Sequence, residues 1–164
     1  MGHTYRSFTY EVSREKLREY ARATGVHDPA LEADASEVPL RSLTAPPTFA
    51  ACFSVGVLDQ IIADPELGAH WNLLHGSQAF RFARPVRGGD VLRCTPRITD
   101  LTSRASMERL TLVVEAVEAD TGEPVVEADS TILFLTGAAQ EDAAPEDPAQ
   151  QGSTRQGPVQ GGAA

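Results

Sequence analysis

The residues with most potential for acid/base chemistry lie in a short loop, where His27 is followed directly by Asp28. An imidazole and a carboxylate can act together as a general base and the group that orients it. Adjacent loop residues usually point apart, and Asp28-Pro29 is also a common turn starter whose carboxylate binds nearby backbone. The sequence therefore favours a turn here, with a substitute catalytic pair as the alternative.

A second group of candidate residues surrounds the start of an apolar segment. Pro46-Pro47 fixes the chain where a helix should begin, so Phe49 either lines a ligand pocket or packs in the core. Phe53, further along, is assigned to the core. His75 begins a later strand, where it either contacts substrate or a partner or binds backbone. Both interpretations of His75 stay open.

Several classes of function are disfavoured by composition. The formal net charge of -9 opposes binding to nucleic acid or to an anionic membrane. No apolar run approaches a bilayer span, which predicts a cytoplasmic protein. Cys52 and Cys94 lack a second nearby cysteine and are predicted to be buried thiols. His3 and His70 have no ligand at metal-binding spacing, and nucleotide-binding glycine motifs are missing, so we expect no metal and no cofactor.

The groups near His27 must be positioned by a strand and a helix that precede them. Apolar residues alternate with polar ones over 8–12, which predicts a first strand with one buried face. A surface helix should follow from about Arg14, with Ser13 as its N-cap and Gly25 just past its end.

A second predicted helix begins at about Pro47 or Thr48 and continues to Ala63, where Asp64-Pro65 ends it. This helix is apolar almost all round, so other elements must cover it. Four later strands should follow one another as an antiparallel meander joined by hairpin turns. The strands are expected near 78–83, 91–100, 109–119 and 125–135, and the turns are 87–90 and 120–123.

This order of elements predicts an α+β protein with a single hotdog fold, in which an antiparallel sheet is wrapped around a long central helix. One sheet edge and one helix flank stay available for a partner, so a monomer is not expected. The domain should cover 1–137. The acidic, Gln-, Pro- and Gly-rich residues 138–164 bury too little apolar surface to offset their ordering entropy and are predicted to be disordered.

Four segments carry a resemblance to a known family. They are Gly25-Val26-His27-Asp28-Pro29-Ala30-Leu31, Ala45-Pro46-Pro47-Thr48-Phe49, Leu74-His75-Gly76-Ser77-Gln78-Ala79-Phe80 and Arg84-Pro85-Val86-Arg87-Gly88-Gly89-Asp90. In their order and spacing the chain resembles the MaoC-like (R)-specific hydratase and dehydratase superfamily over roughly residues 5–136. It is most similar to the N-terminal-type half and to HadA-type subunits of (3R)-hydroxyacyl-ACP dehydratases.

The resemblance also shows what this chain lacks. Active members carry Gly-Asp-x-Asn-Pro-Leu-His, whose Asp and His handle the proton and the water of the reaction. The motif's Asp position is Val26 here and its His position is Leu31. Because neither hydrocarbon side chain can exchange a proton, the roughly 10² to 10⁴-fold that a positioned general acid or base supplies is missing from these positions.

The resemblance therefore implies a non-catalytic subunit of a heteromeric (3R)-3-hydroxyacyl-thioester dehydratase of the fatty-acid type. A HadB-type hotdog partner would supply the catalytic pair and act on an acyl-ACP or acyl-CoA thioester. This chain would stabilise the partner and line the acyl channel. The residues implied in substrate binding or the interface are Pro46, Pro47, Thr48, Phe49, His75 and Gln78.

Two alternatives are retained. The first is a homodimeric enoyl-thioester hydratase or thioesterase with a nonstandard site at His27 and Asp28. The second is a non-enzymatic acyl-binding hotdog protein. Arginines at 81, 84 and 87 could suggest a phosphate site, but scattered solvent-facing charges are the default interpretation.

Overall fold

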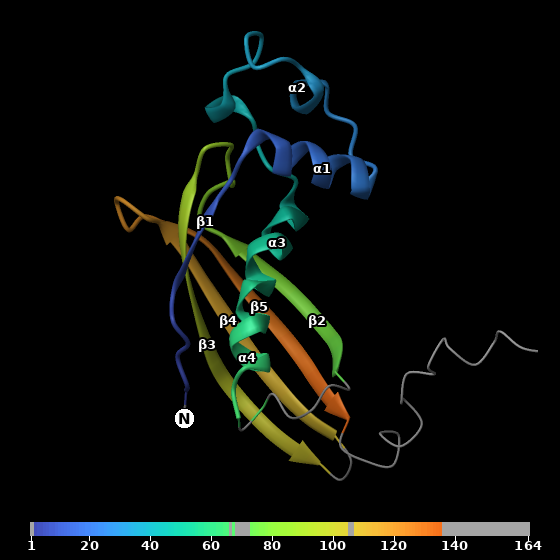
Figure 1. Ribbon diagram of the computed structural model, residues 1–164, viewed down its shortest axis with the longest axis vertical. Coiled ribbons are helices and arrows are strands. Elements are labelled where there is room, and N and C mark those ends of the chain that lie inside the picture. Colours follow the sequence, from blue (N-terminus) through green and yellow to red (C-terminus); the bar gives the residue numbers. More distant parts are fainter. Residues whose placement is uncertain (1, 66, 68–72, 105–106, 136–164) are drawn as a thin grey trace, which may run out of the picture.

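The computed structural model describes residues 2–65, 67, 73–104 and 107–135, so the predicted tail at 138–164 lies outside the described residues. Five strands and a series of short helices make up the fold (Figure 1). The strands are β1 (Phe8–Glu11), β2 (Leu73–Phe82), β3 (Val91–Arg104), β4 (Met107–Glu118) and β5 (Pro124–Leu135). The helices are α1 (Arg14–Thr24), α2 (Pro29–Glu32), α3 (Ala51–Ser54) and α4 (Leu58–Ile62), with 3-10 turns at Leu40–Ser42, Pro47–Ala50 and Val55–Val57.

The strands form one antiparallel sheet in the order β1-β3-β4-β5-β2. The predicted meander is correct for β3, β4 and β5 and wrong for β2, which pairs with β5. The turn at 87–90 therefore joins two strands that are not neighbours, and it is not a hairpin turn. The helical path lies across one face of the sheet (Figure 1).

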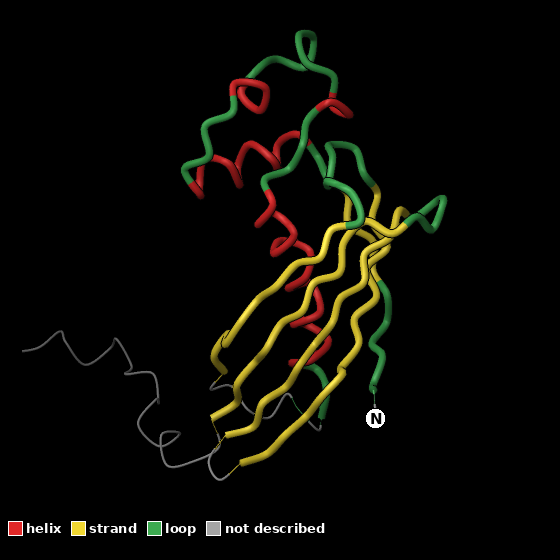
Figure 2. Tube along the Cα trace, turned by 180° about the vertical axis from the view of Figure 1, so that it is seen from behind, coloured by secondary structure: helices red, strands yellow, loops and turns green. Residues whose placement is uncertain are grey.

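The predicted central helix lies against the sheet, as expected for a hotdog fold, and from behind it is seen through the strands (Figure 2). It is not continuous, because 3-10 and α-helical turns alternate from Pro47 to Ile62. Gly56 lies in the central 3-10 turn, and a Cβ there would come 2.9 Å from the ring of Phe8. The missing side chain lets β1 and the helical path approach closely.

One stripe of this helical path forms the core of the protein. Phe49, Phe53, Val57 and Ile61 recur every fourth residue and are fully buried against the sheet. The opposite flank carries Val55 and Ile62, which are exposed. Among the described residues, the helical path is therefore covered on the side that faces the sheet, while Val55 and Ile62 stay exposed. No helix in the described ranges is long and apolar enough to cross a membrane.

The predicted boundaries of α1 are confirmed. Ser13 caps its start, because the Ser13 hydroxyl accepts a hydrogen bond from the Lys16 backbone N–H at 3.2 Å. Gly25 ends it with φ of 70°, a left-handed conformation that glycine adopts without strain. Helices α1 and α2 lie together beyond one end of the sheet (Figure 1). Leu17 and Ala21 are the buried residues of α1.

Candidate functional site

Val26 and Leu31, which align with the motif's Asp and His in the resemblance described above, lie in different environments. Val26 follows α1 and keeps 39% of its surface exposed, whereas Leu31 lies in α2 and is 1% exposed. Leu31 belongs to the same core cluster as Leu17 and Ala21 of α1. One hydrocarbon side chain therefore meets solvent and the other is packed in the core. Neither can hold or move a proton.

Asp28 has a structural role in the loop between α1 and α2. It is the N-cap of α2, and its Oδ1 accepts a hydrogen bond from the Ala30 backbone N–H at 2.9 Å. His27 is exposed. In the described part of the chain no hydrogen bond joins the side chains of His27 and Asp28. This geometry favours the turn interpretation of Asp28-Pro29.

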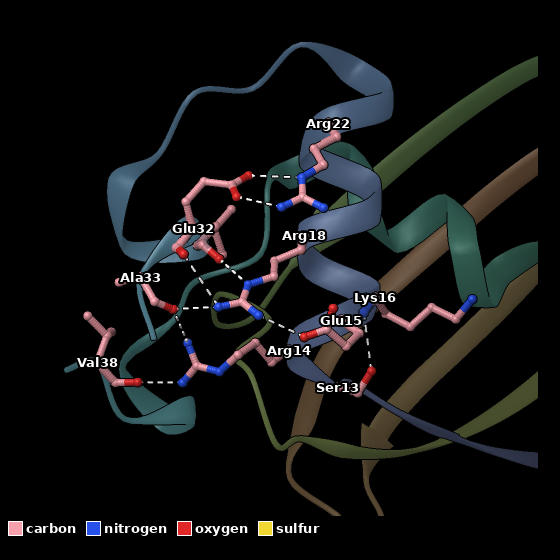
Figure 3. A network of polar contacts seen from close by, with 10 residues as sticks. Ser13, Arg14, Glu15, Lys16, Arg18, Arg22, Glu32, Ala33 and Val38 are labelled. Carbon is pink, nitrogen blue, oxygen red and sulfur yellow. Dashed lines mark hydrogen bonds and ion pairs between the residues drawn. The ribbon is translucent and has the colours of Figure 1, made fainter. Parts of the chain in front are cut away.

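Three arginines of α1 hold the segment that follows the motif (Figure 3). Arg18 donates from Nε to the Leu31 carbonyl at 2.7 Å and from Nη2 to the Ala33 carbonyl at 2.5 Å. Arg14 donates to the carbonyls of Val38 and Ala33. These residues lie four apart and share one helix face. Arg18 thereby satisfies carbonyl oxygens at the end of α2, which a single turn of helix leaves without partners.

Arg22 completes the row of arginines at the surface. Its guanidinium binds both carboxylate oxygens of Glu32, at 2.7 and 3.3 Å. The Arg22 guanidinium that binds Glu32 lowers the pKa of this carboxyl. We refer to Arg14, Arg18 and Arg22 together as the arginine row. Arg14 and Arg18 hold α2 and the segment after it by contacts to the backbone, and Arg22 holds α2 by an ion pair with Glu32.

The four predicted site residues from Pro46 to Phe49 lie in different environments in the structure. Pro46 and Pro47 line a pocket of about 400 Å³ together with Thr44, Ala45 and residues 82–86. Thr48 is exposed. Phe49 is fully buried, with its ring centroid 5.4 Å from that of Tyr20 and 6.3 Å from that of Tyr10. Phe49 is therefore placed as a core residue in this chain.

Two of the three arginines considered for phosphate binding, Arg81 and Arg84, are paired with carboxylates. Arg84 contacts the buried Asp90 at 2.8 Å and Glu118 at 2.9 Å. The hydrogen bond that the Arg84 guanidinium donates to the Asp90 carboxylate raises the pKa of Arg84. Arg81 contacts Glu127 and Asp129. Their charges are compensated within the chain, which favours a structural role over a phosphate site.

His75 and Gln78 meet at one pocket on the helix-covered face of the sheet. Residues three apart in a regular strand face opposite sides. A β-bulge between His75 and Ser77 adds one residue to β2, so His75 pairs with Ile132 while Gln78 pairs with Ser130. Ser54 and Ser130 also line this pocket. Sequence reasoning missed both serines, and Gly76 inside a strand was the only signal of the bulge.

The described residues offer no metal site, since no three of their His, Cys, Asp or Glu side chains gather within binding reach. Both cysteines are free thiols. Cys94 is buried, and desolvation raises the pKa of its thiol to about 12. Burial also raises the pKa of Cys52. Neither thiol is activated as a nucleophile.

Comparison with known proteins agrees with this fold. A UPF0336 protein of Thermobifida fusca is 41% identical over 133 residues, covering 79% of this chain and 86% of that protein. A chain of the C-terminally truncated HadBC complex, a 3R-hydroxyacyl-ACP dehydratase of Mycobacterium tuberculosis, has a TM-score of 0.65 at 28% identity. The match covers 81% of this chain and 94% of that one.

A solved MaoC-like dehydratase has the same fold, with a TM-score of 0.65 at 24% identity. The match covers 83% of this chain and 42% of that protein, so the present chain spans less than half of its length. A family model described as the FAS1-like dehydratase domain region matches residues 1–128. The chain therefore belongs to the FAS1-like dehydratase region family and has a MaoC-like hotdog fold.

Proposed function

We propose that this chain is the non-catalytic subunit of a heteromeric (3R)-3-hydroxyacyl-thioester dehydratase of the fatty-acid type. The observation that carries the proposal is the state of the motif positions. Val26 is exposed and Leu31 is buried in the core, so no proton-handling pair forms there. The similar HadBC chain comes from a two-protein dehydratase complex, which supports an assembly of the same kind.

The surface of the sheet supports a hotdog partner. Strand β2 has ten residues and pairs only with β5 among the described strands, so its other edge presents unpaired backbone groups. Long open edges of this kind readily pair with another chain. Leu74 on this strand is 51% exposed, and Phe82 at its end is exposed too. Val55 and Ile62 extend the apolar surface along the helix flank.

The chemistry belongs to the partner in this proposal. A base of the partner removes the C2 proton of the 3-hydroxyacyl thioester, the C3–O bond breaks with protonation of the leaving hydroxyl, and a trans-2-enoyl thioester and water result. This chain completes the hotdog pair in the cytoplasm and forms part of the acyl channel. The pocket at Pro46 and Pro47 has an apolar lining and a charge-compensated arginine. It therefore suits the neutral part of an acyl-ACP or acyl-CoA thioester.

A matched pair of substitutions tests this assembly. Leu74→Glu places a charge at the open edge of β2, while Leu101→Glu changes an equally exposed leucine, also 51%, on β3. We expect a tagged chain to co-purify with a hotdog protein that carries Gly-Asp-x-Asn-Pro-Leu-His. Leu74→Glu should weaken this capture at least about tenfold, since a charge at an apolar interface is strongly unfavourable. Leu101→Glu should leave it unchanged.

Three results would contradict the proposal. Equal capture by both variants would remove the β2 edge from the interface. Robust hydration of an enoyl thioester by the lone chain would favour a homodimeric hydratase with a nonstandard site. Recovery of homodimer alone, with no turnover and with binding of long acyl chains, would favour a non-enzymatic acyl-binding protein.

A further inference from the structure

The two edges of the sheet differ in what covers them. Strand β2 forms one edge and β1 forms the other. Two residues of the helical path (residues 47–62), Gly56 and Gln60, and Asp64 just after it contact the N-terminal segment that includes β1. These residues lie four apart, so they share one side of the path. This side of the helical path follows the β1 edge.

The outer two of these contacts fix the distance between the path and the strand. At one end Gly56 has no side chain, and a Cβ there would come 2.9 Å from the Phe8 ring. At the other end the Tyr5 hydroxyl donates a hydrogen bond to Asp64 Oδ2 at 3.0 Å. Gln60 lies between these contacts, so its side chain is held within reach of the strand backbone.

Gln60 makes two hydrogen bonds to the backbone of one residue. Its Oε1 accepts from the Arg6 N–H at 3.0 Å, and its Nε2 donates to the Arg6 carbonyl at 2.9 Å. A residue of a neighbouring antiparallel strand makes the same pair of bonds with its own C=O and N–H. The Gln60 amide therefore takes the place of one residue of a further strand.

The bonded groups of Arg6 lie on the side of the strand that faces away from β3. On the β3 side the Tyr5 N–H donates to the Pro96 carbonyl at 3.0 Å, and the Ile98 N–H donates to the His3 carbonyl at 2.8 Å. Residues of an antiparallel strand alternate between bonding to their neighbour and facing away from it. Arg6 follows Tyr5, so its N–H and C=O face the open side of the sheet, where the side chain from α4 covers them.

We propose that Gln60 closes the β1 edge and thereby limits this chain to one partner strand, which pairs at β2. Unpaired edges readily pair with another chain, and covering an edge is a common way to prevent this. Strand β1 itself has only four residues and ends in Glu11, whose charge also opposes edge pairing. The proposal concerns the β1 edge alone, so it does not depend on which protein pairs at β2 or on the dehydratase proposal.

Amide hydrogen exchange and sedimentation test this role in the full-length chain, in the assembly in which it purifies. Gln60→Ala should make the Arg6 amide exchange about threefold to tenfold faster, the worth of one hydrogen bond. A capped edge must give up two bonds before it can pair, so the self-association constant of the β1 edge should rise at least about tenfold. Two copies of one edge can pair with each other. Sedimentation should then show a species of twice the mass of the unaltered assembly, which increases with protein concentration.

Three further variants separate the amide from other effects at this edge. Gln60→Glu keeps an acceptor for the Arg6 N–H and loses the donor to the Arg6 carbonyl, so Arg6 should exchange more slowly than in Gln60→Ala. Asp59→Ala changes the neighbouring exposed residue of α4 and should alter neither exchange nor mass. Thr9→Lys adds a charge to the β1 edge, so combining it with Gln60→Ala should restore the mass of the unaltered assembly.

Three results would overturn the proposal. Unchanged exchange of the Arg6 amide in Gln60→Ala would show that this side chain does not cap the strand. Faster exchange without a species of doubled mass would show that the uncovered edge does not pair. A doubled species that persists in the Gln60→Ala, Thr9→Lys variant would show that the new contact lies away from β1.

Discussion

The loop of residues 25–31 and the strand of residues 73–82 both carry titratable or polar side chains, yet they use them in opposite ways. In the loop, Asp28 caps α2 and Leu31 packs in the core, so both side chains have structural roles. In the strand, a bulge turns His75 and Gln78 toward one pocket with two buried serines. The resemblance of residues 25–31 to a catalytic motif therefore does not indicate where this chain can contact a ligand.

The largest expected effect comes from restoring the motif histidine. Leu31→His should lower the free energy of unfolding by about 2–4 kcal/mol, because it removes buried hydrocarbon and buries a polar ring without a partner. Val26→Asp should change it by less than about 0.5 kcal/mol, because Val26 is exposed. Urea unfolding at a pH where histidine is neutral measures both. An unchanged free energy of unfolding in Leu31→His, together with hydration activity in the Val26→Asp, Leu31→His double variant, would contradict the structural role of the loop.

The arginine row sharpens the same comparison, because it holds the loop to α1. Arg18→Ala should cost about 1.5–3 kcal/mol of unfolding free energy, since it leaves partly buried carbonyls without their charged donor. Arg18→Lys should recover only part of this, because an ammonium cannot reproduce the planar arrangement of donors. Arg22→Ala, which removes an exposed ion pair, should have no measurable effect. Equal losses for Arg18→Ala and Arg22→Ala would show that the row does not support the loop.

A smaller effect concerns the β3 side of the sheet. Burial raises the pKa of the Cys94 thiol to about 12, from about 9 in the unfolded chain. Above about pH 9 the unfolded chain loses this proton and the folded chain keeps it, so stability falls as pH rises toward about 12. Between about pH 8 and about pH 10 the loss should be roughly 1 kcal/mol.

Cys94→Ala should remove this part of the pH dependence, whatever it costs in packing. Cys52→Ala is the matched control, because Cys52 is only half-buried and should contribute less. Unfolding curves of the three proteins at both pH values measure the difference. An identical pH dependence in Cys94→Ala would contradict the burial of this thiol.

Local elements of the fold were predictable because their signals are local. Ser13 and Gly25 bound α1 as expected, and Gly122 occupies the predicted turn between β4 and β5 with φ of 74°. The pairing of β2 with β5 was not predictable from adjacent residues, because it joins strands that are far apart in the sequence. The close approach of Gly56 to Phe8 likewise joins residues that are far apart in the sequence.

The candidate site was predictable to a lesser extent. The loss of titratable side chains at positions 26 and 31 can be read from the sequence, since residue type alone decides it. The burial of Phe49 and the convergence of Gln78 with Ser54 and Ser130 could not. A single extra residue in β2 exchanges the faces of a strand, and a sequence pattern does not show which register the sheet adopts.

The most direct test of the central claim is turnover of a short trans-2-enoyl thioester by the purified chain, alone and mixed with the hotdog partner that it captures. We predict no hydration above background for the lone chain. In the mixture we predict turnover that survives replacement of both His27 and Asp28 by alanine and is lost when the partner's motif aspartate and histidine are replaced. Hydration by the lone chain that disappears in the His27→Ala, Asp28→Ala variant would contradict the account.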